Sequence, residues 1–572
     1  MKSTARFVII TLILLCMLTL RLDVPEVKSN ISGRLINADL PWGDWMHYHN
    51  YDEIVDTLLY LNSTYPNVVD VLPIGRTWQN RTIYCIRLTN ETSIEPKPKV
   101  LFVGYHHARE PITAELSLYY AVSTATEFGV SEAVTRILNF SETYVVIALN
   151  ADGLSVVKQN EWQRKNVHPI DEDGDGLLDE DPPDDADGDG YIEALYQYDS
   201  SNLYPIGWEG VNDDGDSQSN EDWVGGVDLN RNYGYQWNAT CSSGSNYTWA
   251  EDYRGPAPFS ELETQAVRDL AMQHSFTYAI SFHSGAETIV YPWGYASTQT
   301  LDDQIFKEIA GNLSALVGAS YEQAGAWYTT SGVWDDWMYG NRSSLALTCE
   351  IFENDSAWQY ETEQQPGIME ERGIFQAFNP DPIAIEPVVQ RWLPVFTYVT
   401  TRAIDETHNI AITNTTSPKT VIGQGFSTNI TVTVANQGAF EETLQVATYI
   451  NASSLGTQNI TLHSRTSKNI IFTWNTTRYE MDNYIAIINA TPVLEEVNLA
   501  DNAVTYGIKV SIPGDFDGDF KVGPLDFALL ATAFGSTPDK PRWDPNCDVD
   551  GNNKIGPYDF AILSVHYGQH LP

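Results

Sequence analysis

The sequence predicts an α/β domain followed by a β-sandwich and a small helical module, and three observations support this order. Between about residues 48 and 402, continuous apolar runs such as KVLFV and TYVVIAL alternate with segments of helical periodicity. From about 408 to 510, apolar and polar residues alternate with a period of two between frequent turn residues. Residues 513–572 contain one pattern twice. Continuous apolar strands between helices indicate a sheet covered on both faces, and period-two alternation indicates sheets with one solvated face.

Changes in composition suggest four parts. They are a signal peptide or membrane anchor at 1–29, an α/β domain at 45–402, an immunoglobulin-like β-sandwich at 408–510 and an α-helical module with calcium-binding loops at 513–572. Within the α/β domain, residues 168–222 are dominated by Asp, Gly and Asn and contain few apolar side chains. We interpret them as an insertion without a core of its own.

The overall charge excludes two classes of partner. The chain has 32 Lys and Arg residues against 76 Asp and Glu residues, which gives a formal net charge of −44. A field of that sign repels nucleic acid and anionic membranes, and it favours cations. We therefore expect no nucleic-acid partner, and we expect metal-binding loops where the acids cluster.

The N-terminus indicates export. Lys2 and Arg6 precede an apolar run from Phe7 to Leu20, which has the length of a signal-peptide core and is short for a membrane span. No A-x-A cleavage site follows, so a cleaved signal peptide and a retained membrane anchor both remain open. Repeated N-x-[ST] triplets also fit a secreted or cell-surface protein.

Three residues at predicted strand ends suit a zinc ion. His107 and Glu110 follow the apolar strand VLFVG, so an imidazole and a carboxylate stand close together in the chain. Catalytic zinc requires a third protein ligand, and His283 ends a second apolar strand in YAISFHSG. The alternative is an exposed histidine beside an ion-paired glutamate, with a structural histidine at the second strand end.

A series of motifs resembles one family. The segments HARE, WQRKN, GVDLNRNYG, SFHS, YTTSG…DDW and LTCE occur in this order between about residues 45 and 400. This series is similar to that of the zinc carboxypeptidases of the carboxypeptidase A/B type, and Tyr328, Asp336 and Glu350 stand at the separations found in that family. The resemblance implies a mixed sheet with flanking helices, and an exopeptidase that cleaves the C-terminal bond of peptides.

The resemblance also implies the catalytic roles. His107, Glu110 and His283 would bind one zinc ion. Glu350 would be the general base, which takes a proton from the zinc-bound water and later delivers it to the leaving amine. Arg164 would stabilise the oxyanion that develops at the scissile carbonyl.

By the same resemblance, a second group of residues would bind the substrate. Asn230 and Arg231 would hold the terminal carboxylate of the peptide, where a planar guanidinium allows a bidentate contact. Tyr328 would close over the terminal residue, and Arg109 would help to position the peptide. An acid at the place of Asp335 favours Lys or Arg as the terminal residue. The alternative, that Asp335 faces solvent or a metal loop, remains open.

Runs of alternating acids in the insertion predict structural calcium sites, because such runs supply oxygen ligands around a hard cation. The alternative is an acidic loop without metal. The predicted ligands are Asp171, Asp173, Asp175, Asp179, Asp185, Asp187 and Asp189, with a weaker run at Asn212, Asp214, Asp216 and Asn220.

The repeat at 513–572 contains two further acidic loops, each followed by an apolar helical segment. Acids or amides occupy the first, third, fifth and twelfth loop positions, and each set is typical of calcium binding. These positions are Asp515, Asp517, Asp519 and Asp526, and then Asp548, Asp550, Asn552 and Asp559. The repeat resembles a dockerin module, which implies a cohesin-like partner; docking within the chain or to another receptor remains open. The preceding sandwich resembles adhesion-related modules of exported enzymes.

The combined reading is a secreted zinc metallocarboxypeptidase acting on peptides with a free C-terminal carboxylate. One alternative is an adhesion or assembly protein in which the catalytic fold is only a scaffold. Another is a hydrolase of cell-wall peptides on the same fold. The presence of all three zinc ligands and of Glu350 favours the first reading over the scaffold.

Overall fold

The computed structural model describes most of the chain from residue 45 onward. The described residues are 45–93, 97–171, 176–199, 202–212, 215, 220, 222–223, 225–361, 368–438, 440–464, 466–493, 496 and 498–571. The predicted signal or anchor and four predicted calcium ligands, Asp173, Asp175, Asp214 and Asp216, lie outside them. None of the helices in this part of the chain is long and apolar enough to cross a membrane. The chain forms two compact units, and the change from one to the other falls between Val399 and Thr400.

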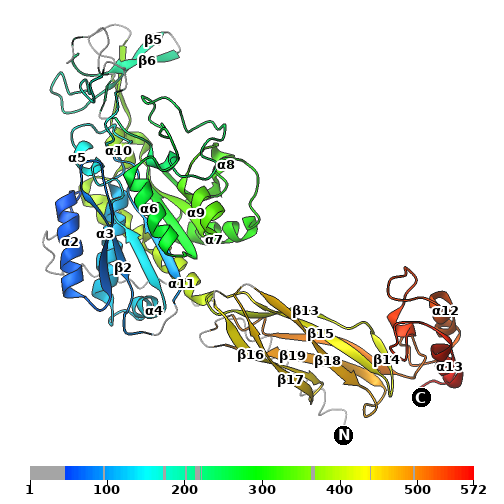
Figure 1. The fold of residues 1–572 in the computed structure, drawn as a ribbon. Coiled ribbons are helices and arrows are strands. Elements are labelled where there is room, and N and C mark those ends of the chain that lie inside the picture. Colours follow the sequence, from blue (N-terminus) through cyan, green and yellow to red (C-terminus); the bar gives the residue numbers. More distant parts are fainter. Residues whose placement is uncertain are drawn as a thin grey trace. The chain divides into compact units, whose positions relative to one another are not determined.

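The first unit is built on an eight-stranded sheet with the order β1-β2-β4-β3-β7-β10-β8-β9 (Figure 1). Parallel pairs join β4, β3, β7 and β10, and also β8 and β9, whereas the other pairs are antiparallel. The sheet is therefore mixed, as predicted. The strands are β1 (Val69–Arg76), β2 (Thr82–Leu88), β3 (Lys99–Val103), β4 (Glu142–Val146), β7 (Tyr278–His283), β8 (Ala286–Tyr291), β9 (Ser320–Gln323) and β10 (Leu345–Phe352).

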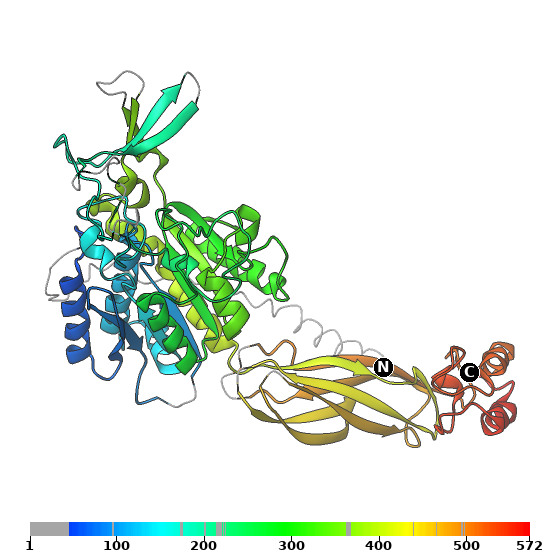
Figure 2. The ribbon, with the colours of Figure 1, turned by 45° about the horizontal axis from the view of Figure 1, so that its top comes forward.

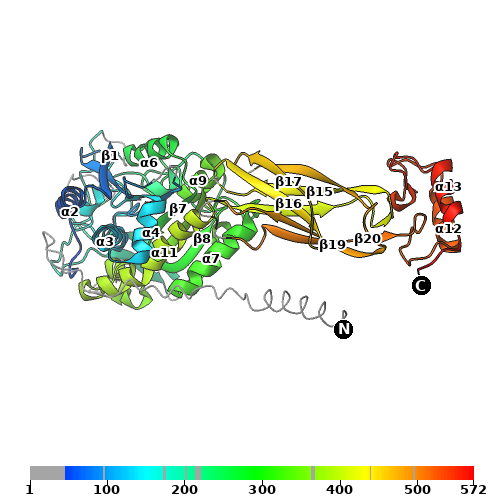
Figure 3. The same ribbon diagram turned by 90° about the horizontal axis from the view of Figure 1, so that it is seen from below.

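Helices cover both faces of this sheet, with α6 and α9 on one side and α3, α7 and α11 on the other (Figure 3). They are α2 (Tyr51–Thr64), α3 (Ile112–Glu127), α4 (Glu132–Phe140), α5 (Gly153–Val156), α6 (Leu262–Gln273), α7 (Asp303–Val317), α8 (Ala324–Trp327), α9 (Trp334–Arg342), α10 (Ile374–Phe378) and α11 (Ile385–Asp405). Successive residues of a strand point to opposite faces. Accordingly Leu101 and Val103 join the cluster under α6 and α9, whereas Phe102 packs against Phe396 of α11, with the ring centroids 4.4 Å apart.

The acidic insertion has a core, which corrects the expectation that it has none. Its strands β5 (Ala194–Asp199) and β6 (Asn202–Trp208) extend a small sheet of order β11-β12-β5-β6 (Figure 1). The other two strands, β11 (Gln359–Glu361) and β12 (Ile368–Arg372), come from a segment far along the chain. Trp162 and Ile192 are buried between the two segments, with Trp208 packed against them. The insertion contributes Trp208 to this cluster, whereas Trp162, Trp223 and Trp358 lie outside residues 168–222, so the core is shared with the rest of the domain.

The second unit contains two facing sheets, of three strands (β13-β15-β18) and of five strands (β14-β20-β19-β16-β17) (Figure 2). Alternate residues of β15 are buried, as period-two patterning requires. The strands are β13 (Ile410–Thr416), β14 (Val421–Gly423), β15 (Ser427–Asn436), β16 (Glu442–Ile450), β17 (Ser453–Leu462), β18 (Ser467–Asn475), β19 (Asp482–Ala490) and β20 (Ala503–Ser511). Two helices follow, α12 (Pro524–Ala533) and α13 (Pro557–His566), and a small cluster around Leu530 and Leu563 forms their core.

Candidate metal centre and substrate pocket

Two neighbouring strand ends and one turn bring the predicted metal ligands together. β3 ends at Val103, and β7, its parallel neighbour, ends at His283. Because parallel strands end at the same edge of the sheet, residues that follow them meet there. Tyr105 adopts the left-handed conformation (φ 62°), and its hydroxyl donates to the Ala108 carbonyl at 2.5 Å. This buried turn directs His107 toward His283.

The three side chains form a compact, buried group. Nδ1 of His107 lies 2.7 Å from Glu110 Oε1, and Nδ1 of His283 lies 3.2 Å from Glu110 Oε2 and 3.2 Å from His107 Nδ1. All three ligand atoms fall within 4.8 Å of one another. Two imidazole nitrogens and one carboxylate are a donor set that zinc prefers. The residues therefore fit a zinc ion, as the sequence predicted.

Asp228 orients this group, and sequence reasoning missed it. Its Oδ1 atom lies 3.0 Å from His107 Nε2, and its Oδ2 atom accepts from Arg164 Nε at 3.0 Å. A carboxylate on the far nitrogen of a ligating histidine fixes the tautomer and the ring plane. Burial alone would raise the pKa of Asp228, but the guanidinium groups of Arg164 and Arg231 hold it well below its usual range. The available signal was its place in GVDLNRNYG, two residues before Asn230.

One cavity beside the metal group gathers five of the predicted residues. Its walls include Asn230, Arg231, Tyr328, Asp335 and Glu350. The Nδ2 atom of Asn230 lies 3.3 Å from Nε2 of the ligand His283, and Glu350 on β10 pairs with His283 on β7. The cavity therefore lies beside His283, although none of the three metal ligands is among its lining residues. Burial, and then the charge of Glu110, raise the pKa of Glu350 well above its usual value.

The two adjacent acids at the start of α9 have different roles. Asp336 accepts from the backbone N–H groups of Gly294 and Tyr295, at 2.8 and 3.0 Å, so it holds a neighbouring turn. Asp335 is only 3% exposed and lines the cavity, so it does not face solvent. Burial raises the pKa of Asp335 to about 6.

Arg109 and Tyr328 differ in how firmly they are held. Arg109 donates to both carboxylate oxygens of Glu251, at 2.9 and 3.1 Å, and its guanidinium lies 4.8 Å from the centre of the Phe378 ring. Tyr328 is 42% exposed at the end of α8. A bidentate ion pair and a ring contact fix the first side chain, whereas the second stands where it is free to meet a ligand.

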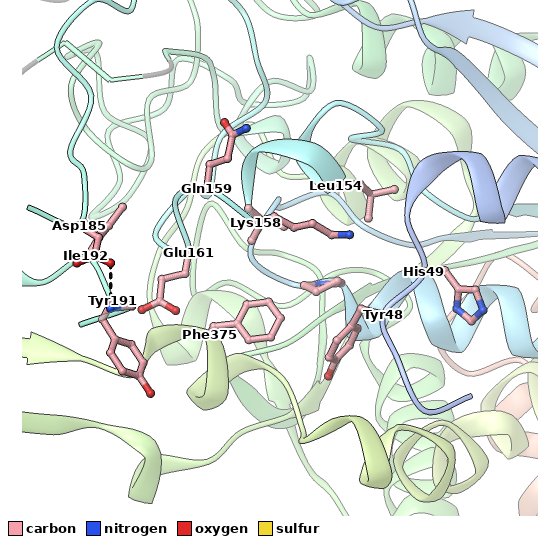
Figure 4. Close-up of a pocket in the computed structure, with 13 residues that line it drawn as sticks. Tyr48, His49, Leu154, Lys158, Gln159, Glu161, Asp185, Tyr191, Ile192 and Phe375 are labelled. Carbon is pink, nitrogen blue, oxygen red and sulfur yellow. Dashed lines mark hydrogen bonds between the residues drawn. The ribbon is translucent and has the colours of Figure 1, made fainter. Parts of the chain in front are cut away.

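A larger cavity, of about 430 Å³, lies elsewhere in this unit and contains none of the metal ligands (Figure 4). Its walls include Tyr48, Glu161, Tyr191 and Phe375. Burial, followed by the charge of Asp189, raises the pKa of Glu161 to about 7. We place the candidate site at the smaller cavity, because the predicted base Glu350 lines it and its wall residue Asn230 contacts His283 of the metal group.

In the insertion, carboxylate oxygens converge at one point. Asp185, Asp187 and Glu209 form a group with ligand atoms within 4.8 Å, and Glu209 had not been predicted. Asp189 instead pairs with Arg372, at 2.6 Å. Asp171 and Asp179 accept from the backbone N–H groups of loop glycines, at 3.0 and 2.7 Å. Glu209, which directly follows β6, was missed because sequence spacing does not show that it lies beside the loop of Asp185 and Asp187.

In the C-terminal repeat, each of the two loops brings three acids together, at loop positions one, three and five in the first loop and one, three and twelve in the second. The ligand atoms of each group lie within 4.8 Å of one another, and the groups are Asp515, Asp517 and Asp519, and Asp548, Asp550 and Asp559. Asp526 is buried and accepts from the N–H groups of Phe516 and Gly523, at 2.7 and 2.8 Å. The side chain of Asn552 donates to Asp550 at 2.8 Å.

Comparison with known proteins agrees with this geometry. A family model described as zinc carboxypeptidase matches residues 54–391, which is more than half of the chain. Carboxypeptidase B of Astacus astacus is 26% identical over 54% of this chain and 87% of its own length. Carboxypeptidase A1 of Bos taurus is 25% identical over 53% of this chain and 62% of its own, so the chain spans less than two thirds of that relative.

Among solved structures, carboxypeptidase A from Helicoverpa armigera is 18% identical, with a TM-score of 0.46, over 63% of this chain and 75% of its own. Residues 54–391, which the family model matches, contain the buried histidine–glutamate–histidine group, the mixed sheet that carries it and the cavity beside it. The chain belongs to the zinc carboxypeptidase family.

Proposed function

We propose that this protein is an exported zinc metallocarboxypeptidase that hydrolyses the last peptide bond of peptides and proteins. One observation carries the proposal: a single cavity is lined by Arg231 and Glu350, and its wall residue Asn230 lies 3.3 Å from His283 of the metal group. A guanidinium that binds a free carboxylate fixes the position of the C-terminus. The adjacent peptide bond is then presented to the base, so that one residue is released.

The chemistry divides among a few side chains. When bound, zinc would supply a Lewis acid that polarises the scissile carbonyl and lowers the pKa of a water molecule. Glu350 accepts a proton from the attacking water and then donates it to the leaving amine. Arg164 donates to the carbonyl oxygen as negative charge develops there. Its Nε is bonded to Asp228, so the terminal nitrogens of Arg164 remain for this contact.

Binding of the substrate end rests on Arg231 and Asn230. Arg231 is 4% exposed, and a buried guanidinium binds a carboxylate more strongly than one in water does. Tyr328 closes over the terminal residue from the exposed side of the cavity. Asp335 provides a buried negative charge in the same cavity, so the preferred terminal residues are Lys and Arg.

The acidic loops bind structural calcium. The convergence of carboxylates at Asp185, Asp187 and Glu209, and in the two C-terminal loops, supports this assignment. The C-terminal repeat acts as a dockerin-like module, whose partner is a cohesin-like domain. The apolar run after Lys2 and Arg6 and the repeated N-x-[ST] triplets support export, to the medium or to the cell surface.

The test measures release of free amino acids from a panel of peptides that differ in their C-terminal residue. We expect the zinc-loaded wild type to release only the terminal residue, fastest for Arg and Lys, and a chelator to stop the reaction. Glu350→Gln should lower kcat by about 100- to 10,000-fold, the usual contribution of a positioned acid–base group.

Glu132→Gln is the matched control, since it makes the same change at an exposed residue of α4 and should keep full activity. If a folded, zinc-loaded wild type releases nothing from any peptide, the chain is not a carboxypeptidase. The result would then favour the alternative of an adhesion or assembly protein that uses the fold only as a scaffold. Cleavage restricted to peptides with D-residues would instead favour cell-wall peptides as the substrate.

A further inference from the structure

The guanidinium of Arg231 donates a hydrogen bond to a serine side chain. Its Nε donates to Ser243 Oγ at 3.0 Å, and its NH1 donates to the Asn230 carbonyl at 2.8 Å. Its Nε also lies 4.0 Å from Asp228 Oδ2. Arginine has five N–H groups. With two bonded among the described residues, three remain, and a bidentate contact to a carboxylate requires two.

The hydroxyl of Ser243 is itself oriented by an acid. Ser243 Oγ donates to Asp252 Oδ2 at 2.9 Å, and the Gly244 N–H donates to the same oxygen at 2.8 Å. An ionised carboxylate only accepts hydrogen bonds, so the single hydroxyl hydrogen of Ser243 points to Asp252. A lone pair of Ser243 then points to Arg231. The direction of this hydrogen-bond chain is therefore fixed from Arg231 through Ser243 to Asp252.

The backbone of Ser243 is bonded to the segment that follows Tyr328. Its N–H donates to the Thr329 carbonyl at 3.1 Å, and its own carbonyl accepts from the Ser331 N–H at 3.2 Å. The next residue, Gly244, has φ +107°, and a Cβ there would stand 2.2 Å from Ser331 Oγ. Only glycine allows this close approach. One residue thus contacts both the carboxylate-binding arginine and the segment that carries Tyr328.

We infer that Ser243 and Asp252 form a positioning pair, which orients the guanidinium of Arg231 toward the terminal carboxylate of the substrate. Through the backbone of Ser243, the pair also fixes the position of Arg231 relative to the segment that carries Tyr328. The inference rests on the proposed carboxypeptidase function. Without Ser243, the guanidinium loses the contact that sets its plane. Free-carboxylate ligands should then bind more weakly, while the groups that carry out hydrolysis are unchanged.

The first experiment compares Ser243→Ala with wild type by steady-state kinetics on a peptide ending in Arg. Hydrogen bonds to charged groups contribute about tenfold to hundredfold in affinity. We expect KM to rise by that factor with kcat little changed, because carboxylate binding is shared by the ground and transition states. Asp252→Ala should have a similar effect, and the double variant should be no worse than either single variant.

Ser243→Thr retains the hydroxyl and should restore KM. Ser242→Ala is the matched control, because the Ser242 hydroxyl bonds the Thr329 carbonyl at 2.9 Å and not Arg231. Inhibition by acetohydroxamic acid, which has no carboxylate and binds only a metal, should be the same in all variants. An altered acetohydroxamic acid affinity or an equal rise in KM for Ser242→Ala would show a general structural defect and overturn the inference.

A binding experiment separates this inference from the proposed function. Calorimetry compares free arginine with argininamide, which lacks the carboxylate. The wild type should prefer arginine, and Ser243→Ala should lose most of that preference. A wild type that shows the preference but hydrolyses no peptide would overturn the proposed function and keep the inference. An unchanged KM and an unchanged preference in Ser243→Ala would overturn the inference alone.

Discussion

The zinc-type group of the first unit and the acidic loops of the second unit obtain their ligands in opposite ways. His107 and His283 are 176 residues apart, and both are 2% exposed. Asp515, Asp517 and Asp519 instead lie within one loop, and the last two are exposed. The core of the sheet therefore assembles the first group before any metal binds. In the loops only a local turn brings the acids together, so the calcium proposed there would have to hold them against their mutual repulsion.

The two regions also differ in how they shift the pKa of a carboxyl group. Burial alone would raise the pKa of Glu110, but the neighbouring His107 and His283 hold it below its usual range. Burial raises the pKa of Asp515, and the nearby Asp526 adds to this effect. The protein thus stabilises the charged form of the zinc-site carboxylate and disfavours that of the loop carboxylate. Loss of metal should affect activity in the first unit and stability in the second.

The largest expected effect comes from removing a ligand of the buried group. His283→Ala should lower peptide hydrolysis by at least about a thousandfold, since the metal contributes several kcal/mol to transition-state stabilisation. The thermal unfolding of the second unit should not change. Parallel assays of zinc content, activity and calorimetry check this. Asp517→Ala is the reciprocal variant and should keep full activity; a comparable loss of activity there would contradict the division between the units.

Removal of calcium should have the next largest effect, and in the other unit. At a calcium concentration a hundredfold above Kd, one bound ion stabilises a fold by about 2.7 kcal/mol. Calcium-selective chelation should therefore lower the Tm of the second unit while the peptidase rate stays near that of the untreated protein. Differential scanning calorimetry with and without calcium measures this. The comparison would fail if both units lost stability equally, or if the second unit did not respond.

The difference between the regions also explains what the sequence could predict. His107, Glu110, His283 and Glu350 were accessible because each lies at or beside the end of an apolar strand within a recognisable motif. That the acids of each C-terminal loop lie close together was accessible because they alternate within a few residues of the chain; calcium binding there stays a prediction. Asp228 and Glu209 were missed, because a residue that acts through another, or across a sheet, leaves no periodic signal.

The fold shows the same limit. The sheet covered on both faces and the sandwich followed from patterns of burial, which sequence periodicity reports, whereas the mixed strand directions came from the family resemblance. The pairing of β5 with β12 could not be predicted, because Ala194 and Glu371 are far apart in the chain and nothing local sets their register. The same pairing gives the insertion its core. A sequence pattern therefore predicts too little regular structure where two insertions, far apart in the chain, pair with each other.

Asp335 lies in the first unit, but burial raises its pKa as it does that of the loop acid Asp515. Burial raises its pKa to about 6, and the adjacent Asp336 is also shifted upward by burial and by Asp335. Arg231 and Glu350 line the same cavity. Near neutral pH the ionised carboxyl of Asp335 is available to a cation, which in the proposed function is the basic terminal side chain of the substrate.

The preference for a terminal Arg over a terminal Leu should therefore depend on pH. A raised pKa means that the carboxyl is neutral below about 6 and charged above it. The ratio of kcat/KM for the two peptides should rise about tenfold between pH 5 and 7, the value of one charged hydrogen bond. Asp335→Asn should give a flat ratio, measured over the same range. A wild-type ratio that falls with rising pH would contradict the role of Asp335.

The smallest effect concerns a lysine that the sandwich places against the second acidic loop. Lys419 is 6% exposed, and its Nζ donates to the carbonyls of Asp548 and Val549. Burial lowers the pKa of Lys419, although the loop acids oppose this shift. The ammonium group holds the loop backbone, but its charge repels a cation bound nearby. Its removal should therefore have two opposed consequences.

Lys419→Met should destabilise the second unit by about 1 kcal/mol at saturating calcium, because buried carbonyls lose their donor. It should also raise the calcium affinity of the second loop by a few-fold, since one positive charge is removed near the ion. Calorimetric Tm and calcium titration measure the two effects separately. Lys468→Met, on the exposed face of β18, should change neither. If calcium affinity falls instead, Lys419 contributes more by shaping the loop than by its charge, and the loop is then organised in part by the sandwich, as the zinc group is by its sheet.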